Sequence, residues 1–328
     1  MTGRPPAIVS VDLDNLWAYL KTHGDPGWRD HPSFLPAAVP RLLDVLGGQH
    51  LRATVFVVGA DAVREDGAKA VNEIAAAGHE VANHSFGHEP WLHRYSRDRL
   101  DEELSRTEDA IVAAGAPVPS GFRGPGYSVT RELVELLVER GYRYDASTWP
   151  TWIGPLARAY HNRGTSAAAA EATDTAEEGR DELFGGFSRV FAPVHPYRWR
   201  TDTGARLVEL PVTTMPLLRT PIHGSYLVQL NAVSPRLARG YFRTALRLCL
   251  GLGVTPSLLL HPTDVLEGTE APGMEFFPGM GARSGKAALV SWALRTLCEQ
   301  FDVVGTGEYV RRSPVRRERP VARLDARR

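Results

Sequence analysis

Two aspartates stand two residues apart just after the first apolar stretch of the chain. Residues 7–11 are small or β-branched and predict a buried strand, and Asp12 and Asp14 follow in the run VDLDN. Because side chains alternate along a strand, both carboxylates should point to the same side. The carboxyl ends of parallel strands carry the active site in α/β proteins, so the pair could do catalytic chemistry. Acids are also common in plain turns, so the pair alone is a weak signal.

Two histidines, His84 and His88, follow the third predicted strand in the run NHSFGHE. We expect them on one helical turn, where residues four apart share a face and both imidazoles can reach one ion. With a strand-end aspartate they form a set of two histidines and one carboxylate that leaves coordination positions open. Structural zinc sites are usually closed by four protein ligands, so this set favours a catalytic metal.

Three further polar clusters follow later predicted strands. Arg123, in FRGPGYS, could hold an aspartate in place, and the glycines beside it could expose a backbone N–H to an oxyanion. Asp145 and Trp149 stand in YDASTWP, and His261 ends the strand in SLLLHP, where it could act as a general acid. Each cluster alone has an ordinary reading as a turn or a structural histidine. Their joint placement at five strand ends indicates one catalytic mouth.

Strands and helices alternate along the chain. Continuous apolar runs predict strands at residues 7–11, 53–58, 79–84, 142–147, 207–212, 256–261 and 301–305, and another ends in the run GFRG. Capped or amphipathic runs predict helices at residues 35–48, 61–78, 96–115, 130–141, 234–253 and 284–300. This order favours parallel βαβ units with about seven strands, in an α/β barrel rather than an open sheet.

The bulk composition is that of an ordinary globular chain. The 328 residues carry 38 basic and 38 acidic side chains, so no net charge draws the chain to nucleic acid. The first apolar run is too short for a signal peptide and no stretch could span a bilayer, so we expect a cytoplasmic protein without a transmembrane segment. Cys249 and Cys298 lie in apolar helical stretches and are expected to be buried thiols rather than a disulfide.

We expect one domain at residues 1–310, with two regions outside the alternating pattern. Residues 157–186 are rich in alanine and acid and predict an insertion, partly helical and partly mobile. Residues 311–328 hold eight arginines against Glu318 and Asp325. This composition predicts a disordered basic tail, with weak contact to a membrane surface as the alternative.

The five polar clusters resemble, in order, the five motifs of the NodB-type polysaccharide deacetylases, carbohydrate esterase family four. They read VDLDN, HSFGH, RGPGY, DASTW and LLLH, and the resemblance covers residues 8–304 apart from the acidic insertion. It implies a distorted (β/α) barrel, a divalent metal, usually zinc (Zn²⁺), and removal of an N-acyl group, most often acetyl, from an amino sugar. Leu13 separates two aspartates that are adjacent in most members, but strand alternation still places both on one side.

The resemblance also implies a role for each catalytic residue. Three residues would bind the metal: Asp14, His84 and His88. Asp12 would be the general base, oriented by Arg123. His261 would be the general acid, supported by Asp145.

Four more residues are implied to contact the substrate. An extra glycine precedes Tyr127 in the third motif, so the N–H that faces the oxyanion is assigned to Gly126. Tyr127 would lie beside the substrate, Trp149 would wall the sugar groove, and Leu258 would line the acyl pocket.

The substrate and two other protein classes stay open at this stage. A cytoplasmic substrate could be a small, lipid-linked or nucleotide-linked amino sugar, and a formamido sugar or a cyclic amide is the alternative. A catalytically silent carbohydrate-binding protein would not need all of the polar motif residues. A non-haem iron oxygenase could use the same two histidines and carboxylate, but it gives no task to Asp12, Arg123 and His261.

Overall fold

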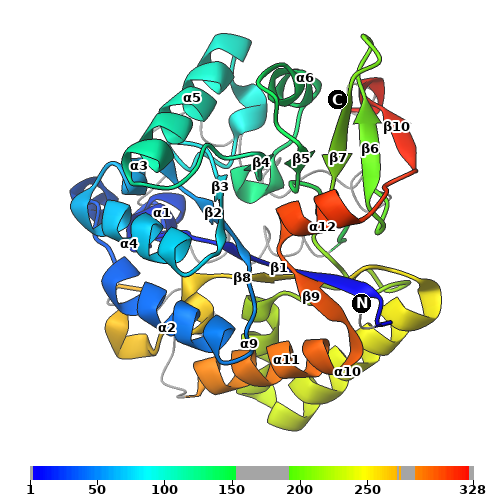
Figure 1. The fold of residues 1–328 in the computed structure, drawn as a ribbon. Helices are drawn as coiled ribbons and strands as arrows, with labels where there is room; N and C mark the ends of the chain where they lie inside the picture. Colours follow the sequence, from blue (N-terminus) through cyan, green and yellow to red (C-terminus); the bar gives the residue numbers. More distant parts are fainter. Residues whose placement is uncertain (1–2, 153–191, 272, 275–284, 325–328) are drawn as a thin grey trace.

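The computed structural model describes residues 3–152, 192–271, 273–274 and 285–324. One curved, mostly parallel sheet runs through its centre in the order β10-β6-β7-β5-β4-β3-β2-β1-β8, and β9 pairs with β1 (Figure 1). The strands are β1 (Pro6–Asp12), β2 (Thr54–Val57), β3 (Glu80–Asn83), β4 (Gly121–Phe122), β5 (Tyr144–Asp145), β6 (Tyr197–Arg200), β7 (Arg206–Glu209), β8 (Ser257–Leu260), β9 (Asp302–Val304) and β10 (Glu318–Pro320).

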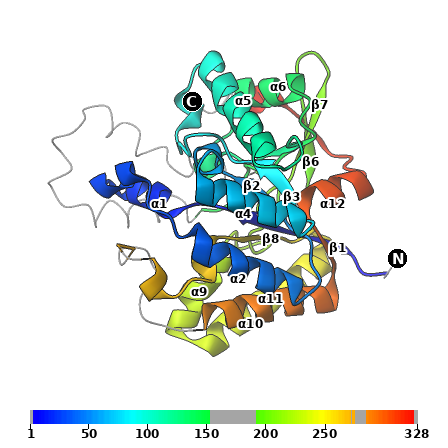
Figure 2. The ribbon, with the colours of Figure 1, turned by 60° about the vertical axis from the view of Figure 1, so that its left-hand side comes forward.

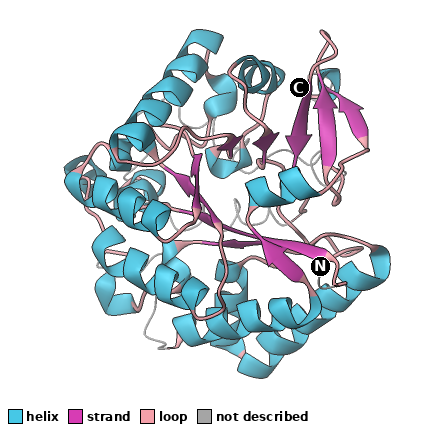
Figure 3. Cartoon of the chain, in the orientation of Figure 1, coloured by secondary structure: helices cyan, strands magenta, loops and turns pink. Residues whose placement is uncertain are grey.

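Helices surround the strands (Figures 1 and 3). The α-helices are α1 (Leu16–His23), α2 (Leu35–Gly47), α3 (Gly59–Ala62), α4 (Glu65–Ala76), α5 (Arg97–Ala113), α6 (Arg131–Glu139), α9 (Gly224–Val233), α10 (Pro235–Leu252), α11 (Lys286–Gln300) and α12 (Thr306–Arg312). Short 3₁₀ helices are η1 (Pro26–Asp30), η2 (Leu92–Arg94), η3 (Pro125–Tyr127), η6 (Pro262–Asp264), η7 (Gly268–Glu270) and η8 (Val321–Arg323). Seen from the side, α2, α10 and α11 lie together below β1 and β8 (Figure 2).

The side chains of β1 alternate between two cores, and this alternation positions the site. Val9 and Val11 pack in the largest apolar cluster, which includes residues of α2, α4, α10 and α11. Ile8 belongs to a smaller cluster on the inner side, together with Phe56 and Tyr144. The polar residues Ser10 and Asp12 share the parity of Ile8, so β1 directs them inward.

The predicted barrel of about seven parallel strands is confirmed. The strands β7, β5, β4, β3, β2, β1 and β8 form a continuous run of parallel neighbours. Two strands that the sequence did not reveal extend this run: β6 pairs antiparallel with β7, and β10 pairs parallel with β6. β10 (ERP) has no apolar alternation, and in β6 (YRWR) two buried aromatic residues alternate with arginines over only four positions, which is at the short limit for a strand pattern.

The basic C-terminal segment differs from the expected disordered tail. Residues up to 324 belong to the fold: β10 pairs with β6, and η8 buries Val321 in a cluster that contains Tyr197 and Leu207. An ion pair of 2.6 Å joins Glu318 in β10 to Arg206 in β7. Glu318 therefore has a pairing role that composition alone does not reveal. The predicted insertion at residues 157–186 lies outside the described residues.

The predicted helix at residues 61–78 divides into α3 and α4. Asp61 does not cap a helix; its Oδ1 accepts hydrogen bonds of 2.8 Å from both Asn15 Nδ2 and Trp17 Nε1. Both cysteines are free thiols, Cys249 buried and Cys298 half-buried, as predicted. Across the part of the chain that the structure describes, no helix has the length and apolar character needed to cross a membrane.

Candidate active site

Three of the predicted site residues meet where β1 and β8 end. His261 directly follows β8, which is the neighbour of β1 in the sheet. Its Nε2 lies 4.0 Å from Oδ2 of Asp12 and 4.0 Å from Oδ2 of Asp14. Both carboxylates therefore face one space, as strand alternation predicted, and the imidazole closes that space on one side.

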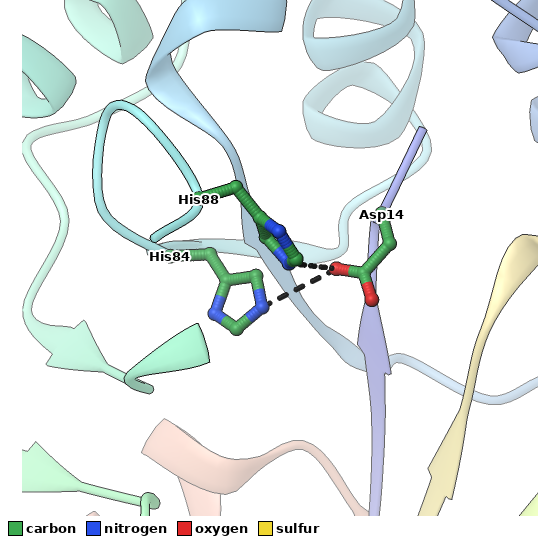
Figure 4. A group of neighbouring side chains, drawn as sticks. All are labelled: Asp14, His84 and His88. Carbon is green, nitrogen blue, oxygen red and sulfur yellow. Dashed lines mark hydrogen bonds and ion pairs between the residues drawn. The ribbon is translucent and has the colours of Figure 1, made fainter. Parts of the chain in front are cut away.

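Asp14, His84 and His88 form a candidate metal site (Figure 4). Oδ1 of Asp14 lies 3.3 Å from Nε2 of His84 and 3.0 Å from Nε2 of His88. All three ligand atoms lie within 4.8 Å of one another. Two imidazole nitrogens and one carboxylate oxygen are the donors that zinc prefers, and three protein ligands leave room for water or substrate. The donor set therefore fits the predicted divalent metal.

The two histidines lie on a loop, and the predicted helical turn is wrong. Residues 84–89 are not helical, and Ser85 and His88 have positive φ of 59° and 48°. One carboxylate oxygen of Glu103, on α5, accepts hydrogen bonds of 2.8 Å from the backbone N–H groups of Phe86 and Gly87. Glu103 thus holds the loop in the shape that brings both imidazoles to Asp14. No feature of the sequence marked this residue.

Hydrogen bonds behind the metal site orient His84. Its Nδ1–H donates to the carbonyl oxygen of Arg123 at 2.6 Å, so Nε2 is left with a lone pair directed at Asp14. Burial lowers the pKa of His84, but the carboxylates of Asp12 and Asp14 outweigh it and raise the pKa. Burial opposes ionisation of Asp14 as well, but the two histidines hold the pKa of its carboxyl well below the usual value.

Arg123 crosses the interior from the end of β4 to β1. Its Nη1 donates to Oδ1 of Asp12 at 2.5 Å and to Oγ of Ser10 at 3.1 Å, and its Nε donates to the carbonyl oxygen of Ala146 at 2.9 Å. Only 1% of Arg123 and 3% of Asp12 is exposed. The guanidinium therefore fixes the carboxylate of Asp12 by Oδ1 and leaves Oδ2 on the side of His261. This arrangement agrees with the predicted pairing of Asp12 and Arg123.

In the described part of the structure, no contact joins Asp145 to His261. The prediction that Asp145 supports His261 is therefore wrong. Oδ1 of Asp145 accepts a hydrogen bond of 2.5 Å from Ser147, whose Oγ accepts one of 2.8 Å from the N–H of Gly124. The carboxyl of Asp145 also hydrogen-bonds to that of Glu209, the residue paired with it in β7. Asp145 thus supports the third-motif loop from behind, because β5 directs its side chain towards β7 and Ser147.

The support for His261 comes from two residues that the sequence analysis missed. Oδ2 of Asp264 accepts a hydrogen bond of 2.8 Å from the backbone N–H of His261 and lies 4.0 Å from its Nδ1. Oγ of Ser225, on α9, lies 3.2 Å from the same Nδ1. Asp264 could have been found in the sequence, since the run HPTD places a capping acid three residues after the histidine.

An aromatic wall flanks the site. The rings of Tyr127 and Trp149 have centroids 4.7 Å apart and planes tilted by 39°, and the ring centroid of His223 lies 5.6 Å from that of Trp149 and 6.3 Å from that of His261. Burial, followed by the charge of Asp12, raises the pKa of Tyr127 above its ordinary range. Burial lowers the pKa of His223 to about 3, so its imidazole is neutral. His223 connects this wall to His261, and contact of Tyr127 and Trp149 with a substrate stays a prediction.

Leu258 does not face this wall, and its predicted place in the acyl pocket is wrong. Leu258 pairs with Val9 and belongs to the outer core, whereas Leu259 packs with Trp149 and Tyr127. The reason is the two-residue period of a strand: Leu259 shares the parity of His261, and Leu258 does not.

Gly126 lies in η3 with φ of 60°, a conformation that favours glycine. A Cβ at this position would come within 2.9 Å of Cβ of Pro90, which follows the metal-site loop. The close approach explains why the third motif carries a glycine before Tyr127. The use of its N–H for an oxyanion stays a prediction.

The comparisons with known proteins agree with this arrangement. Residues 25–144 match the sequence model of the family described as polysaccharide deacetylase. A peptidoglycan deacetylase from Helicobacter pylori is 29% identical over 144 residues, which are 42% of this chain and 47% of that protein. A chitooligosaccharide deacetylase from Rhizobium leguminosarum bv. trifolii is 37% identical over 79 residues, 24% of this chain and 35% of that protein.

A solved structure extends the likeness in fold to nearly the whole chain. It is a Mycobacterium smegmatis protein provisionally described as a polysaccharide deacetylase, with a TM-score of 0.62, 22% identity, and coverage of 97% of this chain and 95% of that one. The chain spans less than half the length of the two curated relatives. The resemblance predicted from the motifs is confirmed: the matched family model and the curated relatives support a NodB-type polysaccharide deacetylase of carbohydrate esterase family four.

Proposed function

We propose that this protein is a metal-dependent hydrolase that removes an N-acetyl group from an amino sugar. The observation that carries the proposal is the convergence of Asp12, Asp14 and His261, with Nε2 of the histidine 4.0 Å from an oxygen of each carboxylate. One residue binds the metal, one takes a proton and one gives a proton. Relatives described as peptidoglycan and chitooligosaccharide deacetylases support an acetylated amino sugar as the substrate class.

Asp14, His84 and His88 would hold the metal, and we propose zinc. A divalent cation bound there supplies a Lewis acid that polarises the amide carbonyl and lowers the pKa of water. The ligand set also suits iron, so the identity of the metal rests on the chemistry of the remaining residues. Amide hydrolysis gives a task to Asp12, Arg123 and His261 that an oxygenase would not.

Asp12 is proposed as the general base. Its Oδ1 is held by Arg123, so Oδ2 is the oxygen available to accept a proton from the attacking water. His261 then donates a proton through Nε2 to the departing amine, which is a poor leaving group without it. The N–H of Gly126 is proposed to donate a hydrogen bond to the developing oxyanion.

The adjacent, mutually tilted rings of Tyr127 and Trp149 would form an apolar wall for a sugar ring or its acyl group. We propose Leu259, in place of Leu258, as the residue that contacts the acyl methyl, because it packs with both rings. A small, lipid-linked or nucleotide-linked amino sugar remains the proposed form of the substrate. Location in the cytoplasm, expected from the sequence, stays a prediction.

Acetate release and zinc content, measured together, test the proposal. Purified protein is loaded with zinc and incubated with N-acetylglucosamine oligomers and with nucleotide-linked N-acetylglucosamine. We expect wild type to release acetate, Asp14→Ala to lose zinc, and Asp12→Asn to keep zinc but lose turnover by about 10²- to 10⁴-fold. Asp98→Asn, an exposed aspartate on α5, is the matched control.

Two results would overturn parts of this proposal. If the zinc-loaded wild type releases acetate from none of a panel of acetylated amino sugars, the proposed activity is wrong. If Asp12→Asn hydrolyses them at a rate close to that of wild type, Asp12 is not the base. Activity that requires oxygen and a reductant would instead favour the iron oxygenase.

A further inference from the structure

The two ring nitrogens of His261 face different surroundings. Nε2 faces the reacting groups, 4.0 Å from Oδ2 of Asp12 and from Oδ2 of Asp14. Nδ1 faces away from them and lies 3.2 Å from Oγ of Ser225 and 4.0 Å from Oδ2 of Asp264. An imidazole that transfers a proton through one nitrogen depends on what the other nitrogen contacts.

Asp264 is tied to the backbone on which His261 stands. Its Oδ2 accepts a hydrogen bond of 2.8 Å from the N–H of His261, and its own N–H donates to the carbonyl oxygen of His261 at 3.0 Å. These two bonds close the short η6 turn, and only 1% of Asp264 is exposed. Its position relative to the imidazole is therefore fixed by the chain itself.

Ser225 reaches the same place from α9. Its hydroxyl hydrogen-bonds to the carboxyl of Asp264 and lies beside Nδ1 of His261. The preceding residue, Gly224, makes this approach possible: a Cβ there would lie 2.2 Å from Oδ2 of Asp264 and 2.8 Å from Cδ2 of Leu260. The first turn of α9 therefore packs directly against the carboxyl, and any larger residue at position 224 would push the two apart.

We infer that Ser225 and Asp264 are a positioning pair that fixes the orientation and the tautomer of His261; this inference rests on the proposed deacetylase function. A serine hydroxyl has one hydrogen to donate. When it donates that hydrogen to Asp264, its oxygen accepts a hydrogen bond from Nδ1–H of His261. The protonated ring then carries the hydrogen that Nε2 donates to the amine, and the neutral ring left after the transfer keeps its proton on Nδ1.

Ser225 and Asp264 thus have the role of supporting His261, which the sequence motifs assigned to Asp145. Asp145 is occupied by Ser147 and Glu209. Ser225 and Asp264 come from parts of the chain that follow β7, outside the residues 25–144 that match the family model. Ser225 and Asp264 are therefore positioning residues, acting on the substrate only through His261.

A spectroscopic test reads the tautomer without relying on activity. Zinc-loaded protein with ¹⁵N-labelled histidine is studied by long-range ¹H–¹⁵N correlation, and His261 is assigned by its loss in His261→Gln. We expect the neutral ring of wild type to be protonated on Nδ1, and Ser225→Ala to shift the proton towards Nε2. Ser225→Thr, which keeps the hydroxyl, should retain the wild-type tautomer.

A kinetic test uses two leaving groups. An amine must be protonated to depart, whereas the 4-nitrophenolate of 4-nitrophenyl acetate departs as the anion. Ser225→Ala and Asp264→Asn should lower kcat for an N-acetylglucosamine oligomer by about 10- to 100-fold, the usual range for a lost orienting partner. KM for the oligomer and the rate with the aryl acetate should change much less, and Ser225→Thr should restore most of kcat.

Matched controls separate positioning from general damage. Ser105→Ala on α5 and Asp302→Asn in β9 make the same chemical changes away from the site, and melting temperature and zinc content are measured for every variant. The inference is wrong if His261 of wild type carries its proton on Nε2, if Ser225→Ala leaves the tautomer unchanged, or if both substrates slow equally. If wild type hydrolyses neither substrate, the proposed function fails, while the tautomer still decides the inference.

Discussion

The carbonyl oxygen of Arg123 lies 2.6 Å from Nδ1 of His84, while the guanidinium of the same arginine lies 2.5 Å from Oδ1 of Asp12. One residue therefore orients a candidate metal ligand through its backbone and the candidate base through its side chain. The two contacts are separable, because a substitution removes the guanidinium but keeps the carbonyl group. This separation explains how the third motif can serve metal binding and proton transfer at once.

Replacement of Arg123 by alanine should lower stability and turnover while leaving metal binding much less affected. Asp12 would remain buried without its partner, and loss of one member of a buried ion pair typically costs about 3–5 kcal/mol. We expect the free energy of unfolding, measured with urea, to fall by that order and acetate release to be lost. Zinc affinity should fall far less, since the bond from His84 to the backbone at position 123 persists.

Arg97→Ala is the control for this experiment. Arg97 pairs with Glu139 on the surface, with side chains 42% and 60% exposed, and such pairs contribute about 0–1 kcal/mol. If Arg123→Ala destabilises the protein no more than this control does, the buried pair does not hold β1 and β4 together. If zinc binding is abolished in a folded Arg123→Ala, the two roles are not separable.

Glu103 should control metal affinity from a distance. Its carboxylate binds two backbone N–H groups of the loop that carries His84 and His88, and it does not belong to the ligand set. We expect Glu103→Ala to weaken zinc binding by about 10- to 100-fold while the protein stays folded, because the loop is no longer held in the binding conformation. Competition with a chromogenic chelator measures the affinity.

The neighbouring residue on α5 gives a closely matched control. Glu102 is exposed and pairs with Arg106 four residues later in the same helix. Glu102→Ala removes the same carboxylate from the same helix without touching the loop, so its zinc affinity should equal that of wild type. Equal zinc affinity for Glu103→Ala and Glu102→Ala would show that the loop keeps its shape without the hydrogen bonds to Glu103.

The sequence predicted the polar residues at the strand ends well, because parallel βαβ units bring those ends to one edge. Asp12 and Asp14 converge with His261 for this reason, and Arg123 reaches Asp12 across the interior. The loop of His84 and His88 differs from its prediction. A spacing of four fits one helical turn. Here two positive φ angles and the hydrogen bonds from the loop to Glu103 bring both imidazoles to Asp14 without a helix.

The motif order suggested Asp145 as the partner of His261, yet Ser225 and Asp264 lie beside that imidazole. Ser225 was beyond the sequence, because α9 meets η6 only in three dimensions, whereas Asp264 follows His261 by three residues and could have been found. The short strand β10 was missed, since an arginine-rich segment has no apolar alternation to reveal pairing. The assignment of Leu258 was avoidable: strand parity alone favours Leu259.

Leu259→Ala should therefore change acyl selectivity, whereas Leu258→Ala should not. Leu259 packs with Trp149 and Tyr127, so its truncation would enlarge the proposed acyl pocket. We expect the ratio of kcat/KM for N-propionyl to N-acetyl glucosamine oligomers to rise in Leu259→Ala. Both leucines are buried, and both variants should lose about 2–5 kcal/mol of stability. An equal ratio in the two variants would place the acyl group elsewhere.

The buried carboxyls of Asp145 and Glu209 should make stability depend on pH. Burial raises the pKa of Asp145 from 3.8 to about 6, and burial together with the charge of Asp145 raises the pKa of Glu209 well above its ordinary value. Between pH 3.8 and about pH 6, the folded protein keeps a proton on Asp145 that the unfolded chain has released. The free energy of unfolding must then fall as the pH rises through this window, and the stabilisation is complete only below it.

Asp145→Asn tests this dependence directly. The asparagine stays neutral at every pH, can accept from Ser147 as Asp145 does, and can donate to Glu209 as a protonated carboxyl would. A pKa rise from 3.8 to about 6 corresponds to roughly 3 kcal/mol, so the wild type should lose stability of that order across the window relative to the variant. Asp61, whose pKa burial also raises to about 6, titrates in both proteins and cancels in the difference. Urea unfolding at a series of pH values measures both curves; if they run parallel, the carboxyl of Asp145 does not hold a proton in the folded state in this window.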